Sequence, residues 1–188
     1  LCSDHSEIIL DNTELYRALI PSVEARDLPG YQPLHSSLLL FCREIKRNFT
    51  VALSGECADE LFGGYPWYHN RDILFEDCFP WSREQGIRRQ VLKKGLLPKG
   101  EEYVRQRYLD TIGSADKLRG ESDPDRRMRE MFALNFYWFM QCLLERKDRC
   151  SMYSGLEVRV PFCDYRLVEY AYNMPWELKA YNGREKGI

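Results

Sequence analysis

A short apolar segment, residues 49–53 (Phe-Thr-Val-Ala-Leu), runs directly into a glycine-containing loop and an acidic helical stretch. The segment is apolar, partly β-branched and bounded by polar residues, which is the pattern of a buried strand. Two helical patterns precede it, and residues 6–10 have the pattern of another strand. The first helix is predicted to run through Val23 with Asp11 or Thr13 as its cap, and the second is predicted to have Ser36 or Ser37 as its cap. This alternation of strands and helices predicts a parallel sheet, so residues 1–65 are interpreted as an α/β edge.

The pattern changes after Tyr65, where the sequence predicts helices and no further strand. We therefore predict a mainly helical part over residues 66–188, which makes the α/β chain helix-rich overall. The helices are predicted over residues 101–119, from Asp123-Pro124 onward, and over residues 164–173.

Composition excludes several classes of protein. Lys plus Arg is 27 and Asp plus Glu is 29, a near balance that argues against a nucleic-acid binder. No apolar run approaches the roughly 18–20 residues that span a bilayer, which argues against a membrane protein. The seven cysteines are odd in number and show no C-x-x-C spacing, so neither a disulfide framework nor a zinc site fits. Scattered free thiols are typical of the cytoplasm, and a cytoplasmic location is expected.

The loop that follows the predicted strand starts with Ser54 and Gly55. In an open parallel sheet, ligands bind beyond the carboxyl ends of the strands, where this loop would lie. Gly55 permits a tight turn and close approach of a ligand to the backbone. Free N–H groups at the start of the next helix can hold phosphate oxygens.

Three carboxylates follow, at Glu56, Asp59 and Glu60. In a helix their spacing puts them on one face, where mutual repulsion favours a bound Mg²⁺, a bound amine or one raised pKa. A carboxylate there could take a proton from an attacking amine. A structural interpretation is equally open, because acidic residues complement a helix dipole and Gly63-Gly64 can simply end the helix.

A second dense segment follows the long helix. Glu157 and Arg159 alternate with apolar residues, so both charges lie on one side of an extended piece. Arg159 could pair internally with Asp148 or Asp164, or it could bind a carboxylate or phosphate. The sequence pattern leaves both interpretations, structural and functional, open for Glu157 as well.

Together the two segments resemble the glutamine-hydrolysing asparagine synthetase family. The first resembles the family's S-G-[ED]-x-x-D-E-x-F-G-G-Y and reads Ser54-Gly55-Glu56-x-x-Asp59-Glu60-x-Phe62-Gly63-Gly64-Tyr65. The second resembles D-R-x-S-M-x-x-G-L-E-x-R-x-P-F-L-D and reads Asp148-Arg149-x-Ser151-Met152-x-x-Gly155-Leu156-Glu157-Val158-Arg159-Val160-Pro161-Phe162-x-Asp164.

The resemblance implies a fold and a reaction. The fold is an adenine-nucleotide α-hydrolase-like (ATP-pyrophosphatase) parallel sheet with an extensive helical layer. The reaction activates aspartate with ATP and Mg²⁺ to β-aspartyl-AMP and pyrophosphate, and glutamine-derived ammonia then displaces AMP to give asparagine. A homodimer of the full-length parent is compatible with this resemblance.

The family's functional residues carry over to matching positions. Ser54 and Gly55 resemble positions that contact the nucleotide and the intermediate. Glu56 matches the catalytic carboxylate that accepts a proton from attacking ammonia. Asp59 matches an acidic residue near Mg²⁺ and pyrophosphate, and Tyr65 resembles a pocket residue.

Glu157 resembles a residue of the site wall that contacts the nucleotide or intermediate. The chain departs from the family in four ways. Gln141-Cys142 stands before Leu143-Leu144, where many members have Asp-Asp. The pyrophosphate-binding S-G-G-x-D-S loop is missing from residues 1–188, a catalytic Lys after the Asn182-Gly183 region is missing, and Cys57 stands where Gly is common. We interpret Cys57 as tolerated packing and expect a fragment of the synthetase domain that is inactive by itself.

Two rival hypotheses remain. Asparagine-synthetase-like domains also adenylate other carboxylates, as in β-lactam synthetases and peptide-cyclising enzymes, and a Tyr–Glu relay through Tyr65 and Glu157 would favour that branch. A non-catalytic interaction remnant is the other. The cluster of three carboxylates without compensating basic residues nearby argues against it.

Overall fold

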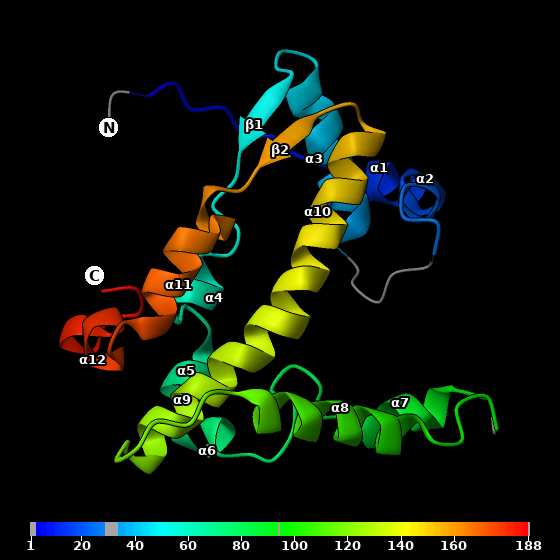
Figure 1. Ribbon diagram of the computed structural model, residues 1–188. Helices are drawn as coiled ribbons and strands as arrows, with labels where there is room; N and C mark the ends of the chain where they lie inside the picture. Colours follow the sequence, from blue (N-terminus) through cyan, green and yellow to red (C-terminus); the bar gives the residue numbers. More distant parts are fainter. Residues whose placement is uncertain (1–2, 29–33, 94, 188) are drawn as a thin grey trace. The chain divides into compact units, whose positions relative to one another are not determined.

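The computed structural model describes residues 3–28, 34–93 and 95–187, without the side chains of residues 85, 88 and 89 (Figure 1). Its contacts divide the chain into two compact units. Unit 1 comprises Leu1–Glu56 and Cys142–Pro161, and unit 2 comprises Cys57–Gln141 and Phe162–Ile188.

Unit 1 contains a two-stranded parallel sheet, and helices precede each of the two strands in the sequence. Its elements are α1 (Asn12–Arg17), α2 (Leu19–Glu24), α3 (His35–Lys46), β1 (Val51–Leu53), all but the first residue of α10 (Gln141–Tyr153), and β2 (Glu157–Arg159). β1 and β2 lie side by side with Ala52 opposite Val158 (Figure 1). The ladder is extended by Glu157 N–H donating to the Thr50 carbonyl at 3.0 Å.

The strand predictions were correct only in part. A parallel strand does form within residues 49–53, but it is not buried, because Leu53 is 75% exposed and no third strand pairs with it among the described residues. The prediction of no strand after Tyr65 was wrong. β2 is only three residues long and carries two charges, so its pairing with β1 decides its conformation rather than its own pattern.

The predicted strand at residues 6–10 was also wrong. These residues are extended but pair with no strand in the described part of the chain, and Ile9 is 88% exposed. An isolated apolar segment lacks the ladder bonds that make a strand stable.

The helix predictions in unit 1 are confirmed in part. Asp11 caps the first helix, as predicted, with Glu14 N–H donating to Asp11 Oδ1 at 2.7 Å. The single helix predicted through Val23 is instead divided into α1 and α2 at Ala18. α3 instead begins at His35, and the predicted serine caps were wrong. Ser36 is buried within the helix, and the Ser37 hydroxyl donates to the Leu34 carbonyl.

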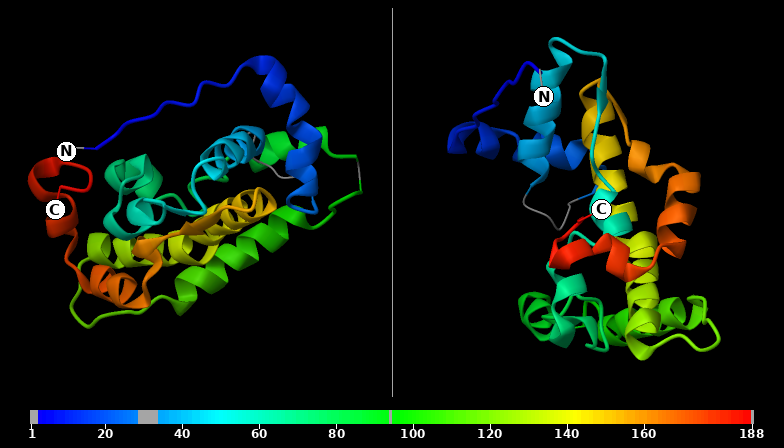
Figure 2. Two further views of the ribbon diagram at one scale, coloured as in Figure 1. Left: turned by 90° about the horizontal axis from the view of Figure 1, so that it is seen from above. Right: turned by 90° about the vertical axis from the view of Figure 1, so that its left-hand side faces the viewer.

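Unit 2 contains helices and no strand among its described residues. Its elements are α4 (Ala58–Phe62), α5 (Pro66–His69), α6 (Arg71–Leu74), α7 (Gln85–Val91), α8 (Gly100–Ser114), α9 (Asp123–Leu134), the π-helical turn η1 (Asn135–Met140), α11 (Tyr165–Asn173), α12 (Trp176–Lys179) and the 3₁₀ turn η3 (Tyr181–Gly183). The 3₁₀ turn η2 (Pro161–Cys163) joins the two units in the sequence. α8 packs beside α9 (Figure 2).

Three helix predictions for unit 2 are confirmed in their main features. α8 ends at Ser114, earlier than the predicted 119. α9 begins at Asp123 with Pro124 in its first turn and the Ser122 hydroxyl oxygen accepting from Asp125 N–H. α11 covers the last predicted helix.

Two aromatic-rich clusters form the core of unit 2. The first contains Tyr68, Leu74, Phe79, Tyr108, Met131 and Leu134. The second contains Leu61, Phe132 and Ala171, from α4, α9 and α11. Because Leu61 is fully buried there, the short α4 is anchored from its apolar side.

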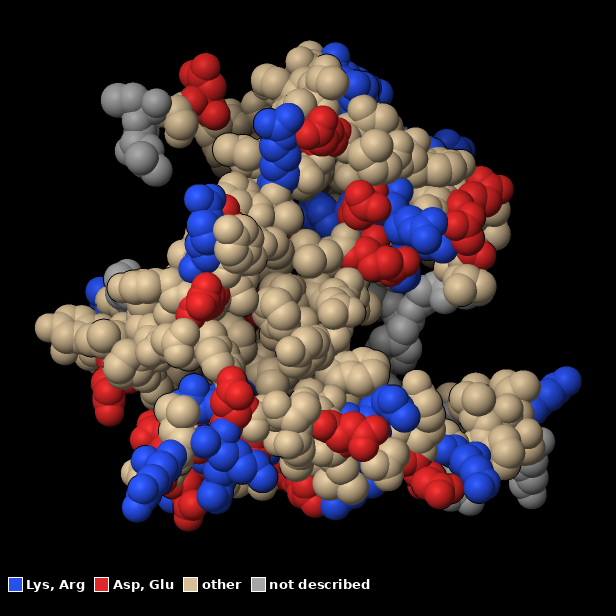
Figure 3. Space-filling model, in the orientation of Figure 1, with Lys and Arg blue, Asp and Glu red and all other residues tan. Residues whose placement is uncertain are grey.

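Charged side chains of both signs intermingle on the face seen in Figure 3. The ion pairs of unit 2 include Arg126–Asp123 and Lys99–Glu102. In the part of the chain that the structure describes, no helix has the length and apolar character needed to cross a membrane.

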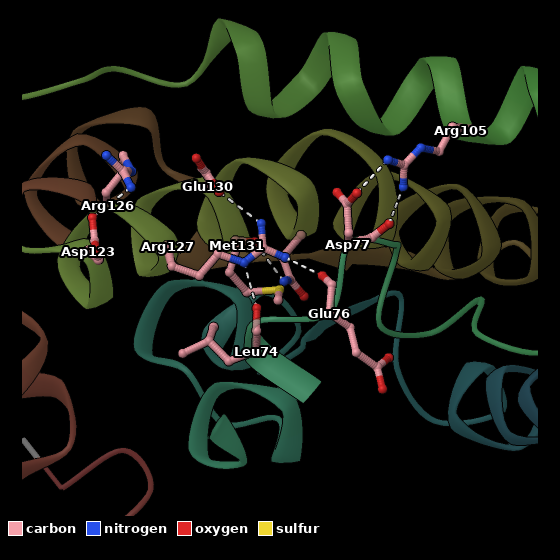
Figure 4. Close-up of polar contacts among 10 residues, drawn as sticks. Leu74, Glu76, Asp77, Arg105, Asp123, Arg126, Arg127, Glu130 and Met131 are labelled. Carbon is pink, nitrogen blue, oxygen red and sulfur yellow. Dashed lines mark hydrogen bonds and ion pairs between the residues drawn. The ribbon is translucent and has the colours of Figure 1, made fainter. Parts of the chain in front are cut away.

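A buried arginine ties α9 to the chain that follows α6 (Figure 4). Arg127 Nε donates to the Leu74 carbonyl at 2.5 Å, Nη2 donates to the Glu76 carbonyl at 2.7 Å, and Nη1 pairs with Glu130 at 2.8 Å. Charge-assisted bonds of this kind are roughly twice as strong as neutral ones, and these lie out of solvent. Arg127 therefore fixes a turn that has no regular secondary structure.

We predict that Arg127→Met lowers the free energy of unfolding by about 2–4 kcal/mol, because two buried carbonyls lose their donors. The neighbouring Arg126 forms an exposed pair with Asp123 at 2.7 Å, so Arg126→Met should change stability by less than about 0.5 kcal/mol. Urea denaturation of the two variants measures both effects. Equal losses in the two variants would contradict the role given to Arg127.

Candidate functional site

The loop of residues 54–56 follows the carboxyl end of β1. Ser54 N–H donates to the Arg159 carbonyl at 2.9 Å, which extends the ladder by one bond beyond Leu53. Glu56 N–H then points at Ser54 Oγ, at 3.4 Å. A Cβ built on Gly55 would meet no atom of the described residues within 4 Å, so the backbone at Gly55 is open to a ligand.

Glu56 is the best-defined charged group of this loop. Its Oε1 lies 3.4 Å from Arg146 Nη2 and 3.4 Å from Lys147 Nζ, both on α10. The Glu56 side chain is 17% exposed, and its Oε2 is buried without a hydrogen-bond partner among the described residues. Two cations therefore hold one oxygen of the carboxylate, and the other remains able to accept a proton or hydrogen bond.

This geometry corrects two expectations about the carboxylates. Glu56 does not share a helix face with Asp59 and Glu60, because α4 begins only at Ala58 and Glu56 belongs to unit 1. The argument that the carboxylates lack basic neighbours was also wrong. Arg146 and Lys147 are far from Glu56 in sequence, so local spacing gave no indication of the pairing.

Cys57 explains why the helix starts late. Its φ is 76°, a left-handed conformation that favours glycine, and its side chain is almost completely buried. Interpreting Cys57 only as tolerated packing missed this backbone requirement.

Asp59 lies in unit 2 and pairs with Lys186. Its Oδ1 is 2.6 Å from Lys186 Nζ, and both side chains are partly exposed. A Cβ on Gly64 would stand 1.8 Å from the same Oδ1, so the carboxylate fits only over a glycine. The Lys that follows the Asn182-Gly183 region in the family was interpreted as missing, although Lys186 does follow that region in this chain.

The Tyr65 side chain lies against α4, after the double glycine that ends this helix. α4 ends with Gly63 at φ 68°, and the Tyr65 hydroxyl donates to Glu60 Oε1 at 2.6 Å. Burial, followed by this hydrogen bond, holds the pKa of Tyr65 far above its usual value. The ring stacks on Trp67 with centroids 4.4 Å apart. Tyr65 is thus a neutral phenol fixed within unit 2, and its role toward a ligand stays a prediction.

Glu157 and Arg159 lie on the same side of β2, as predicted. Arg159 Nε donates to Glu157 Oε1 at 2.7 Å, and the side chains of Arg159 and Glu157 are 63% and 51% exposed, respectively. Arg159 pairs with neither of its two predicted aspartate partners within the described residues, and Asp164 pairs with Arg166 instead. An exposed pair of this kind contributes little stability, so both groups are available to a ligand.

The described residues contain no group of three or more His, Cys, Asp or Glu side chains able to hold a metal ion. They therefore provide no site in which protein ligands alone would bind Mg²⁺. Mg²⁺ is commonly held by one or two carboxylates together with substrate phosphates. Asp59 fits that arrangement as a single carboxylate, and Lys186 beside it is suited to phosphate oxygens.

We predict that Gly64→Ala displaces Asp59 from Lys186 and destabilises the chain by roughly 1–3 kcal/mol, because the new Cβ overlaps the carboxylate. Gly113→Ala is the matched control. Gly113 lies within α8, and a Cβ added there would meet no atom of the described residues within 4 Å, so this change should stabilise by about 0.5–1 kcal/mol. Thermal unfolding should show shifts of opposite sign, and an unchanged Tm for Gly64→Ala would refute the packing of Asp59.

Comparison with known proteins shows which family this chain is similar to. The family model for asparagine synthase matches residues 1–188. Glutamine-hydrolysing asparagine synthetase 3 of Bacillus subtilis is 49% identical over 186 residues, which are 98% of this chain and 30% of that protein. Glutamine-hydrolysing asparagine synthetase 1 of the same organism is 28% identical over an alignment of 191 positions, which covers 85% of this chain and 30% of that protein.

The glutamine-hydrolysing asparagine synthetase of Homo sapiens is 25% identical over an alignment of 192 positions, which covers 99% of this chain and 25% of the human protein. The chain thus spans less than a third of the length of these relatives. The match over all 188 residues establishes that the chain belongs to the asparagine synthase family.

Proposed function

We propose that this chain is part of an ATP-dependent amide ligase that makes asparagine from aspartate. The carboxylate of aspartate is adenylated by ATP to β-aspartyl-AMP with release of pyrophosphate, and ammonia from glutamine displaces AMP. The family match and the names of its relatives, glutamine-hydrolysing asparagine synthetases, support this reaction. We extend the proposal to an adenine-nucleotide α-hydrolase-like sheet, of which β1 and β2 would be one edge.

The observation that carries the proposal is the state of Glu56. Ammonia attacks the aspartyl carbonyl, a C–N bond forms, and the C–O bond to AMP breaks. The attacking nitrogen must lose a proton, and the unpartnered Oε2 of Glu56 is suited to accept it. Arg146 and Lys147 hold the other oxygen and offset the cost of burying the carboxylate.

The other predicted residues have binding roles in this proposal. Ser54, the open backbone at Gly55 and the exposed Glu157 would contact the nucleotide or the intermediate. Asp59 would hold Mg²⁺, which supplies charge neutralisation to the phosphates when it is bound. Tyr65 would act through its fixed position beside α4.

Both rival hypotheses lose support. The relatives compared are named as asparagine synthetases, which does not favour another carboxylate substrate. A non-catalytic remnant would have no evident need for a buried carboxylate with an unpartnered oxygen.

We predict that Glu56→Gln, made in an active enzyme that contains this chain, lowers the rate of asparagine synthesis by about 10²–10⁴-fold. ATP–pyrophosphate exchange with aspartate should persist, because Glu56 acts after adenylation. The exposed Glu169 gives a matched control, and Glu169→Gln should leave both rates unchanged. Full asparagine synthesis by Glu56→Gln would reject Glu56 as the proton acceptor.

We predict that the purified 188-residue chain by itself forms neither AMP nor asparagine from MgATP, aspartate and ammonia. The reason is the absence of an S-G-G-x-D-S phosphate loop from its sequence. Chromatographic assay of AMP and asparagine tests this expectation, and sustained turnover would show that these residues suffice for the reaction.

A further inference from the structure

Unit 2 contains a cavity of about 330 Å³ that the proposed reaction does not use. Residues of α4, α5, α9, α11 and α12 line it, together with residues of the connecting segments. They include the apolar or aromatic side chains Tyr68, Met128, Tyr172, Met174 and Trp176. This volume is at the lower end for small-molecule sites, so it suits a compact ligand with an apolar body.

Lys179 gives the cavity an unusual charge. Its side chain lines the cavity and the residue is only 5% exposed. Its ammonium lies 5.0 Å from the centre of the Phe132 ring, and no hydrogen bond or ion pair reaches it from the described residues. Burial, followed by the nearby Arg129 charge, lowers the pKa of Lys179 to about 8.

A buried cation without an anionic partner is costly, since desolvation is not offset. Arg129, the other cation of the lining, already pairs with Glu121 at 3.4 Å and lies over the Tyr172 ring at 5.4 Å. Lys179 is therefore the group of this cavity that an incoming anion would neutralise.

The remaining charges limit the type of anion. Glu60, Glu121, Asp125 and Glu177 also line the cavity, so a ligand with two or more negative charges would meet repulsion. A single carboxylate can pair with Lys179 and leave its apolar part against the aromatic and methionine side chains.

We propose that this cavity binds a small monocarboxylate with an apolar body, whose carboxylate pairs with Lys179. All residues that line the cavity belong to unit 2, whereas Glu56 belongs to unit 1, and the proposal does not depend on the proposed reaction. Binding of such a ligand would make the cavity a second recognition site of this chain.

Methionine methyl groups provide a direct test in the 188-residue chain. It has five methionines, of which Met128 and Met174 line the cavity and Met152 lies in unit 1. In a ¹³C-methyl-methionine NMR titration with benzoate, we expect saturable shifts at Met128 and Met174 and none at Met152. Equal, unsaturable drift of all five resonances, or no shift, would overturn the proposal.

Variants of Lys179 test the contact itself. Lys179→Gln should weaken benzoate binding about tenfold to a hundredfold, because a charge-assisted hydrogen bond is lost. Lys179→Leu, which removes the buried charge, should lose binding and melt no lower than the parent chain. A dispersed methionine spectrum shows that a variant is folded, and at least one of the two variants is expected to keep it. An unchanged benzoate affinity in a folded variant would refute the contact with Lys179.

Two controls complete the test. Lys99→Gln, at an exposed lysine before α8, should bind benzoate as the parent chain does. Inorganic phosphate should shift Met128 and Met174 at least about tenfold less effectively than benzoate. Equal effects of phosphate and benzoate would overturn the monocarboxylate assignment.

Discussion

The parallel pairing of β1 with β2 is the constraint on which the candidate site of unit 1 depends. Three residue pairs, Val51–Glu157 to Leu53–Arg159, join segments that are far apart in the sequence. The bond from Ser54 N–H to the Arg159 carbonyl carries this pairing into the loop. Ser54 of the first motif and Arg159 of the second are thereby brought together at one end of the sheet, which neither motif could achieve by its own local structure.

The pairing also leads to the charge arrangement around Glu56. β2 follows α10 after a short turn in which Leu156 N–H donates to the Ser151 carbonyl at 2.9 Å. α10 supplies Arg146 and Lys147, so the helix that leads into β2 also provides the partners of the carboxylate after β1. A buried carboxylate next to two cations is tolerable, whereas the same carboxylate alone would be strongly destabilising.

Sequence reasoning found what local chemistry determines. The Asp11 cap, the start of α9 at Asp123 and the end of α4 at Gly63 all depend on residues within a few positions, and all are present. It failed where distant contacts decide the outcome. β2 is a strand only because β1 lies beside it, and residues 6–10 are not a strand because none pairs with them in the described part of the chain.

The same distinction applies to the candidate site. The spacing of Glu56, Asp59 and Glu60 identified the segment, but it could not reveal that Cys57 breaks the helix or that each carboxylate has its own partner. The pairings of Arg146, Lys147 and Lys186 were missed because partners of charged groups are set by tertiary structure. Lys179 likewise gave no indication in sequence, since burial decides its character.

The contact between Glu56 and the cations of α10 is central to the proposed role of Glu56. A double-mutant cycle measures that contact directly. The free energies of unfolding of Glu56→Gln, Lys147→Met and the double variant would be compared with that of the parent chain. We expect a coupling of about 1–3 kcal/mol, because each single change leaves a buried charge less well compensated. Additivity within about 0.3–0.5 kcal/mol would show that Glu56 and Lys147 do not interact, and would contradict the account.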